Sequence, residues 1–594
     1  YGNHNTYYCG ERYYGPNIVF TKNSVSDGAT LETSMTGSID FSKTNIQVEG
    51  VDEPDIVKTD GTYIYMIANQ SIYIIKAYPW ANAYVVSRIK TGNNTKEIFI
   101  NNNKLVIFES SYRHPENPPY NETCCWWYGV TTTIIKIYDI ADRTEPKLVK
   151  EVESDGSYFD ARMIGEYVYV ITTEHTYDIY HVTNGNETIN IPEIKIDGVS
   201  KKIPVTKIYY VDIPENDYTL THVLAININD KNKDVNIKSF LLGNTNTMYV
   251  SQHNIYLACT KYNNQAWPLT INTYFESKET TVVHKISIKN GDISYAAQGE
   301  VPGRILNQFS MDEYNGFFRI ATTTGHIWDG NSRNNIYILN QNLSRVSEIE
   351  DIAPGERIHS ARFMGTKAYL VTFKKVDPFF TIDLSDPYNP KILGKLKIPG
   401  YSDYLHPYDE NHIIGIGKET VEALEYQKEM RNLDFAWYQG IKIALFDVTD
   451  FEHPKEIAKI VIGDRGTDTP VLRDHKAFLF DREKNLLVIP VTVYEIDETI
   501  KEQHNGYTGN IYGEFTFQGV YVYRVTVEKG FEFKGRVTHR DDNEPSNGYH
   551  WYWDSDCSIT RSLYIDNVLY TISNKMIKMN DLNTLEELKT VELC

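Results

Sequence analysis

The chain contains few of the patterns that would identify a membrane protein, a zinc protein or a helical protein. Only six cysteines occur in 594 residues, and none shows the paired C-x-x-C spacing of a zinc site. No apolar run approaches the ~18 residues needed to cross a bilayer, so we predict no transmembrane segment. Helical periodicity is almost absent, and only residues 419–433 favour a helix.

An excess of positive charge is also missing. Lys and Arg number 59 against 79 Asp and Glu, which gives a net charge of −20. Proteins that bind nucleic acid carry a basic face that neutralises phosphates, so this balance argues against a nucleic-acid partner. The excess of carboxylates either keeps a large secreted surface soluble or serves to bind a cation.

Three distant segments, by contrast, repeat the pattern D-x-x-D-x-x-x-P-K. They lie at residues 139–147, 383–391 and 447–455, and each follows an apolar strand pattern and precedes another. The Asp side chains can cap a tight turn through backbone amides, and Pro fixes φ where the chain becomes extended again. Three copies of one hairpin indicate a repeat protein.

Strand pairs give a longer series of nine units. Each begins with two strands joined by a short turn and continues with a second pair, and the first pairs lie at residues 55–68, 97–109, 158–172, 237–251, 307–322, 358–373, 403–417, 471–491 and 559–572. Four-stranded units repeated around an axis form a β-propeller. We therefore predict an all-β fold with one large propeller at residues 44–594, and an extended Tyr-rich arm at residues 1–43. Nine blades are expected; eight is the alternative, if the two ends share one composite blade.

Residues 44–61 (TNIQVEGVDEPDIVKTDG) carry a resemblance to a known family. Further matches lie at residues 438–442, 463–468, 474–480, 485–491, 561–565 and 575–578. The chain resembles a family of secreted prokaryotic proteins with a β-propeller domain distantly related to WD40 repeats. Its D-x-x-D-x-x-x-P-K turns are similar to a repeat of bacterial and archaeal surface propellers. The resemblance implies export and a propeller, and it implies no reaction or catalytic residue.

An extracellular or cell-surface location has consequences for cysteine and asparagine, since exported chains form disulfides and carry glycans. A signal peptide removed before Tyr1 would fit this location. Disulfides or buried thiols are the expected states of Cys9, Cys124, Cys125, Cys259, Cys557 and Cys594, and one pairing to consider joins Cys594 to Cys9. N-x-S/T sequons stand at Asn69, Asn93, Asn121, Asn186 and Asn342.

Candidate channel residues follow from the innermost strands, which line a propeller's axis. His359 and His475 each lie six residues before a turn, whereas His406 lies three before its turn and is expected to point the other way. Arg162 and Arg362 share a position three residues before their turns. These side chains are candidates to face the channel. The alternative is a hydrogen-bonded structural role for the histidines and pairing with blade carboxylates for the two arginines.

Two further clusters suggest ligands. Asp464, Asp468 and Asp474 lie close in sequence and could bind Ca²⁺; the alternative is ion pairing with Arg465 or Arg473 between blades. An aromatic and acidic insertion at residues 541–556 could stack on a carbohydrate or pack over the propeller. No nucleophile elbow, H-E-x-x-H, P-loop or dinucleotide motif occurs, so no catalytic residue is predicted.

The arm leads to the functional prediction. It is too polar to form its own core, so it packs on the propeller, stays disordered, or docks on a neighbouring copy as an added strand. Head-to-tail docking does not close and generates filaments. We expect an exported, non-enzymatic surface protein that contacts itself, other surface proteins or glycans; a secreted enzyme or carbohydrate-binding protein is the alternative.

Overall fold

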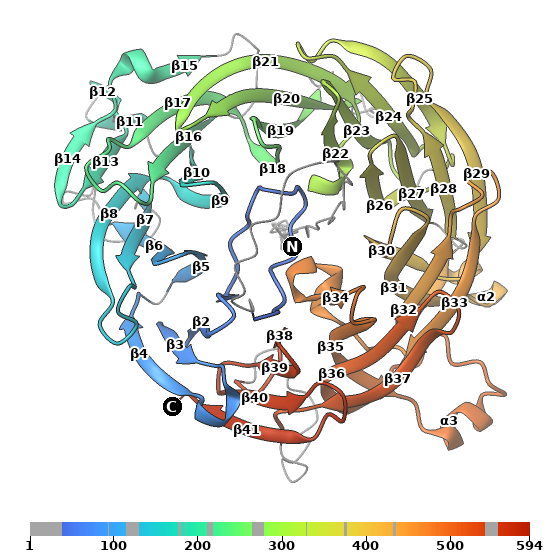
Figure 1. The fold of residues 1–594 in the computed structure, drawn as a ribbon. Coiled ribbons are helices and arrows are strands. Elements are labelled where there is room, and N and C mark those ends of the chain that lie inside the picture. Colours follow the sequence, from blue (N-terminus) through green and yellow to red (C-terminus); the bar gives the residue numbers. More distant parts are fainter. Residues whose placement is uncertain are drawn as a thin grey trace, which may run out of the picture.

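The computed structural model describes residues 39–92, 94–113, 130–175, 180–183, 186–189, 191–210, 218–263, 278–327, 330–373, 377–431, 435–540 and 556–593. Within these residues, nine sheets, each built on four antiparallel strands, surround a common axis and follow one another in chain order (Figure 1). This arrangement is a nine-bladed β-propeller. The predicted all-β fold and the predicted number of blades are therefore confirmed.

Each blade begins with its innermost strand and proceeds outward, strand by strand. Blades 1 to 3 contain β1 (Val57–Thr59), β2 (Tyr63–Ala68), β3 (Ser71–Lys76) and β4 (Tyr84–Lys90); β5 (Thr95–Asn101), β6 (Lys104–Arg113), β7 (Val130–Asp139) and β8 (Lys147–Asp155); and β9 (Ser157–Ile164), β10 (Tyr167–His175), β16 (Tyr218–Asn227) and β17 (Asn236–Gly243). Blades 4 to 6 contain β18 (Thr245–Val250), β19 (Asn254–Asn263), β20 (Lys278–Lys289) and β21 (Asp292–Pro302); β22 (Met311–Tyr314), β23 (Phe317–Thr324), β24 (Arg333–Leu339) and β25 (Arg345–Ile352); and β26 (Arg357–Met364), β27 (Lys367–Phe373), β28 (Asp377–Asp383) and β29 (Lys391–Ile398). Blades 7 to 9 contain β30 (Tyr401–Pro407), β31 (His412–Glu422), β32 (Ala436–Asp447) and β33 (Lys455–Ile462); β34 (Leu479–Asp481), β35 (Leu486–Glu495), β36 (Glu514–Thr526) and β37 (Gly530–Val537); and β38 (Arg561–Ile565), β39 (Val568–Ile572), β40 (Met576–Asp581) and β41 (Glu587–Glu592).

The connection between β10 and β16 adds five short strands. The hairpin of β13 (Glu193–Ile196) and β14 (Val199–Lys202) extends the outer edge of blade 2, and β15 (Ile208–Tyr210) pairs in parallel with β17. A separate hairpin joins β11 (Tyr180–Thr183) to β12 (Asn186–Ile189). The helices within the described residues are α2 (Glu425–Arg431), α3 (Glu498–Gln503) and the 3-10 turns η1 (Trp80–Asn82), η2 (Val205–Lys207), η3 (Gln308–Ser310), η4 (Pro470–Leu472) and η5 (His475–Ala477).

The hydrophobic core lies between neighbouring blades. Middle strands such as β27 are buried along almost their whole length, whereas the outer strand β33 (KEIAKIVI) alternates exposed and half-buried residues. Aromatic rings join adjacent blades. Tyr256 stacks on Phe318 with ring centroids 4.4 Å apart, and Phe379 stacks on Phe446 at 4.7 Å. Such contacts bury apolar area on both faces of each sheet, which is the main stabilising term of the fold.

The two faces of the propeller differ. Because the strands of a blade alternate in direction, turns after the first and third strands lie on one face, here called the turn face; all other connections lie on the opposite face, here called the insertion face. The three D-x-x-D-x-x-x-P-K segments are third-to-fourth-strand turns on the turn face. The longest connections, including residues 176–217, 423–435, 496–513 and 538–560, join strand ends that lie on the insertion face.

The ring closes without a shared strand. Blades 1 and 9 each contain four strands of their own, so the alternative of a composite blade is ruled out. Ile64 and Tyr73 of blade 1 belong to one buried apolar cluster with Ile577 and Leu593 of blade 9. Tyr73 also donates a hydrogen bond from its hydroxyl to the Leu593 carbonyl at 2.7 Å.

Three local predictions were wrong. The fourth unit was placed at residues 237–251, but β17 is the outermost strand of the main meander of blade 3, and β18 begins blade 4. One residue separates β17 from β18, so this boundary between blades resembles a turn within a hairpin. The helix expected at 419–433 begins only at Glu425, because the chain remains in β31 as far as Glu422, and α3 was not predicted.

Candidate functional site

A segment of the chain itself occupies the axis of the propeller. Residues 39–56, here called the channel segment, run through the centre of the ring before β1 begins (Figure 1). The segment forms single β-bridges with the innermost strands of three blades: Phe41 with Ile565, Asp52 with Met163, and Asp55 with Ile98. It contains most of the family-like sequence at residues 44–61, and the predicted boundary between arm and propeller falls inside it.

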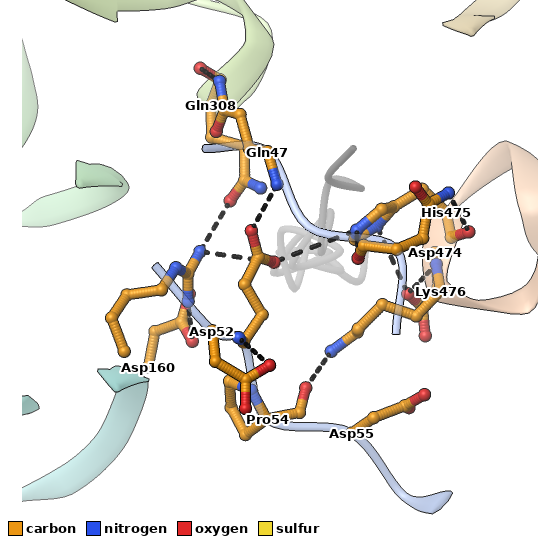
Figure 2. Close-up of polar contacts among 12 residues, drawn as sticks. Gln47, Asp52, Pro54, Asp55, Asp160, Gln308, Asp474, His475 and Lys476 are labelled. Atoms are coloured by element: carbon orange, nitrogen blue, oxygen red, sulfur yellow. Dashed lines mark hydrogen bonds and ion pairs between the residues drawn. The ribbon is translucent and has the colours of Figure 1, made fainter. Parts of the chain in front are cut away.

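Glu53 is the central acidic group of this segment. Its side chain is only 2% exposed, and Oε1 accepts a hydrogen bond from the Gln47 backbone N–H at 2.9 Å (Figure 2). Oε2 lies 3.8 Å from Arg162 Nη2 and 3.8 Å from His475 Nε2. Burial raises the pKa of Glu53 to about 7, although the Arg162 charge opposes this shift.

Arg162 and Lys476 hold the segment from opposite walls. Arg162 on β9 is almost fully buried and forms an ion pair with Asp160 at 2.7 Å. Lys476 Nζ donates to the Pro54 carbonyl at 2.9 Å (Figure 2). It also pairs with Glu97 Oε1 at 2.6 Å. Burial alone would lower the pKa of Lys476, but nearby carboxylates outweigh it and raise this pKa.

Arg561 ties three parts of the chain together near the closure of the ring. Its guanidinium lies on β38 and reaches Asp55 of the channel segment, with Nη2 at 2.9 Å from Oδ1 and Nε at 3.0 Å from the same atom. The same Nη2 contacts the carboxylate of Asp474, which caps η5 before blade 8. Burial raises the pKa of Asp474, but Arg561 and Lys476 lower it more, so the pKa lies below its ordinary value.

The channel segment also forms one wall of a cavity on the turn face. This cavity has a volume of about 1740 Å³ and receives residues from all nine blades. Its lining includes charged side chains of both signs, among them Lys58, Arg362, Asp409, Arg482 and Asp481. We call it the turn-face funnel. The channel segment begins beside the funnel. There the backbone carbonyl of Asp40 accepts a hydrogen bond at 2.6 Å from the backbone N–H of Asp566, which lies in the turn after β38.

His475 and Arg162, two predicted channel residues, meet at Glu53. His475 is not on a strand as predicted: it lies in η5, which Asp474 caps by accepting a hydrogen bond from Lys476 N. Its Nε2–H donates to the Asn45 carbonyl at 3.1 Å. Burial and the surrounding cations lower its pKa well below the ordinary value, so the imidazole is neutral.

The other predicted channel residues lie apart from Glu53. Arg362 lines the turn-face funnel with its guanidinium 5.3 Å from the centre of the Phe309 ring, and burial lowers its pKa. His359 instead lies beside blade 7, where Nδ1 is 3.3 Å from Asp403 Oδ1. His406 also lines the funnel, and burial lowers its pKa to about 3.

The three candidate Ca²⁺ ligands each contact a different set of cations. Asp464 accepts from Ile496 N at 2.8 Å and pairs with Lys501 at 3.1 Å. Asp468 lies between Lys418 at 3.2 Å and Arg473 at 2.7 Å, and Asp474 pairs with Arg561. Calcium binding here stays a prediction, and ion pairing between chain segments is the arrangement observed.

The predicted disulfides and glycans fall partly outside the described residues. This applies to Cys9, Cys124, Cys125, Cys594, Asn93, Asn121 and all but the last residue of the insertion 541–556. Cys259 is buried with Sγ 3.4 Å from the Gly243 carbonyl, and Cys557 is buried before blade 9. Asn342 is exposed in a turn, Asn186 begins β12, and Asn69 donates to the Asn574 carbonyl at 3.2 Å.

These buried and half-buried charges form a clasp, which we define as Asp52, Glu53, Asp55, Lys58, Glu97, Arg162, Asp474, Lys476 and Arg561. Lys58 joins Asp52 at 2.9 Å and also donates to the Glu53 carbonyl. Most of these groups are compensated by an opposite charge, as burial requires. Sequence reasoning named Arg162 and Asp474 but missed the others. The high charge density at residues 49–60, in and just ahead of the first strand, was the signal available.

Comparison with known proteins agrees with this architecture. A family model described as "Beta propeller domain" matches residues 41–585, which include the channel segment from Phe41 onward and all of the propeller except β41, the last strand of blade 9. The chain belongs to the beta propeller domain family. The helices of the described residues do not include one that is long and apolar enough to cross a membrane.

Relatives of this beta propeller domain protein occur in archaea. An uncharacterized protein of Methanocaldococcus jannaschii is 29% identical over 99% of this chain and 89% of its own length. An uncharacterized protein of Archaeoglobus fulgidus is 27% identical over 93% of this chain and 85% of its own length. A crystal structure titled as the eukaryotic initiation factor aligns with 69% of this chain and 87% of its own, at 9% identity and a TM-score of 0.28, which is too low to carry an argument.

Proposed function

We propose that this chain is an exported, non-enzymatic cell-surface protein whose propeller acts as a rigid structural or interaction module, and that it assembles with itself through its N-terminal arm. The observation that supports this proposal is the channel segment. It fills the axis with the chain's own backbone, which buried and half-buried ion pairs fix in place. A channel occupied in this way favours rigidity over passage of a substrate along the axis.

The position of Asp40 supports a role for the arm. The channel segment starts at the rim of the turn-face funnel, where Asp40 also pairs with Lys484 at 2.6 Å. Residues 1–38 are therefore attached at the centre of one face of the disc. An arm at that point can contact a neighbouring copy, another surface protein or a glycan without disturbing the blades.

Removal of residues 1–38 tests assembly. The cut before Ile39 spares the bridge between Phe41 and Ile565, which a cut after residue 43 would destroy. We expect the full chain to form oligomers or filaments in light scattering and electron microscopy, and residues 39–594 to be monomeric with the same thermal midpoint. If both forms are monomeric over the same concentration range, the assembly proposal is wrong.

The alternative is a secreted enzyme or carbohydrate-binding protein that uses the turn-face funnel. The size of the funnel favours this second candidate, since a cavity of about 1740 Å³ exceeds the ~300–1,000 Å³ of most small-molecule sites and could admit a polymer. The test is binding of residues 39–594 to immobilised cell-surface polysaccharide. Binding that is abolished by Arg482→Ala, at the funnel rim, would favour this alternative over the assembly proposal.

A further inference from the structure

The outermost strand of blade 2 presents an open sheet edge. In this sheet the order is β14, β13, β8, β7, β6, β5, so β14 ends it, and among the described residues no strand pairs with its outer side. Figure 1 shows this hairpin outside the ring, beyond β8. An unpaired edge offers a row of N–H and C=O groups to any extended chain.

The hairpin is held firmly on the propeller. Ile194 pairs with Ser154 of β8, and the backbone of Asp197 in the turn donates to the Glu151 carbonyl at 2.9 Å. The Asp197 carboxylate accepts a hydrogen bond in return from Glu151 N at 2.8 Å. The edge is therefore preformed, so that an added strand would not pay the cost of ordering it.

The turn geometry identifies the groups that β14 offers. Asp197 and Gly198 both have positive φ, at 48° and 82°, as a two-residue type I′ hairpin requires. In such a hairpin the flanking pair Ile196 and Val199 is hydrogen-bonded, and the direction of the N–H groups then alternates. The N–H groups of Ser200 and Lys202 consequently point to the open edge.

Large apolar side chains are exposed along the same connection. Val199 is 71% exposed, and Val205 and Tyr210, which follow within a dozen residues, are 66% and 62% exposed. Of these three residues only Val199 lies on β14 itself, and an exposed apolar side chain on an open edge is the kind of group that an added strand can cover. Lys201 and Lys202 disfavour pairing of one β14 with another, because like charges directly opposite are destabilising.

We propose that the outer edge of β14 accepts residues 17–21 (NIVFT) of the arm of a second copy as an added antiparallel or parallel strand. This inference rests on the proposed assembly and names its acceptor. Residues 18–20 are the one run of three large apolar residues within residues 1–38, and the stretch is uncharged and rich in β-forming residues.

The positions of donor and acceptor determine the assembly. The arm starts at the turn face near the axis, whereas β13 pairs with residues 152–154 of β8, at its end on the insertion face. The chain from Thr21 to Ile39 spans up to about 60 Å when extended, while a compact chain of 594 residues has a radius of gyration of about 25 Å. The arm and β14 are different surfaces at opposite faces of the propeller, so the contact between two copies is heterologous. Repetition of this contact gives an open chain of copies.

Ser200→Pro tests the acceptor in the full chain. Proline removes the outward N–H and leaves the inward bonds to β13 in place, which edge strands tolerate. We expect light scattering and electron microscopy to show loss of assembly with an unchanged thermal midpoint. Ser200→Ala, which keeps the N–H and loses the hydroxyl, is the matched control and should assemble as the wild type does. Assembly of Ser200→Pro equal to that of the wild type would overturn β14 as acceptor and leave assembly through the arm intact.

A second measurement tests the acceptor even if Ser200→Pro does not fold. A labelled synthetic peptide of residues 1–38 is titrated into residues 39–594, and hydrogen exchange of β14 is followed. We expect binding that slows exchange in β14 and weakens about tenfold with Ser200→Pro. Binding that protects another element, or a full chain whose β14 is protected in a monomer, overturns the inference. A full chain that neither assembles nor binds the peptide overturns the proposed assembly as well.

Discussion

Replacing Arg561 by Met should lower the free energy of unfolding by about 3–5 kcal/mol. Arg561 is 7% exposed and Asp55 is 4% exposed, so the change leaves a buried carboxylate without its cation. The guanidinium also contacts Asp474, and these three residues belong to blade 9, the channel segment and the approach to blade 8. Met keeps most of the side-chain volume, so the loss reports the charge and its hydrogen bonds. Denaturant titration at pH 7.5 measures the free energy of unfolding.

Two variants control for this experiment. Arg524→Met removes an exposed arginine whose nearest carboxylate, Glu532, is 4.0 Å away, and should change stability by less than about 0.5 kcal/mol. Arg561→Met combined with Asp55→Asn should recover part of the loss, because the amide is neutral and can still accept from Ile56 N. Equal effects of Arg561→Met and Arg524→Met would show that the pair does not hold the ring together.

Glu53→Gln should stabilise the protein more as the pH rises. The folded-state pKa of Glu53 is about 7, above its ordinary value of 4.5, because the carboxylate is buried. The folded protein therefore retains a proton that the unfolded chain loses between pH 4.5 and 7, and wild-type stability falls as pH rises through this window. Gln resembles the protonated acid and does not titrate. Its advantage should grow by about 2–3 kcal/mol between pH 5 and pH 8.

The measured quantity is the difference in stability between the wild type and Glu53→Gln, so the contributions of the other titrating groups cancel. Denaturant midpoints of wild type and Glu53→Gln are measured at half-unit steps of pH. Glu49→Gln is the matched control, since Glu49 lies in the same segment but is exposed, and its difference from wild type should be flat. A Glu53→Gln curve that is flat or falls with pH would mean that Arg162 keeps Glu53 ionised throughout.

The fold could be predicted from the sequence because each blade repeats a local pattern. Strand pairs with short turns, such as residues 358–373, have a periodicity that needs no tertiary information. The pattern failed where a connection between blades is as short as a turn, at the single residue between β17 and β18. It also failed at His475, where the capping contact of Asp474 with Lys476 N forms a 3-10 turn instead of a strand.

The site could be predicted only in part, because its contacts join residues that are far apart in the chain. Asp55 and Arg561 are separated by 506 positions, and Lys476 and Glu97 by 379. Arg162 was identified from its register on an inner strand, which is local information. Nothing local indicates that the residues before β1 turn into the channel; the dense charges at residues 49–60 indicate only that they have partners.

Hydrogen exchange of the channel segment tests most directly whether this segment clasps the ring from within. The amides of Ser42, Asp52 and Asp55 donate to the carbonyls of Tyr564, Met163 and Ile98 on three inner strands. In native buffer, mass spectrometry should therefore show peptides of residues 40–56 exchanging as slowly as β9 and β38, in the full chain and in residues 39–594 alike. Complete exchange of residues 40–56 within seconds, while β9 and β38 stay protected, would contradict the clasp.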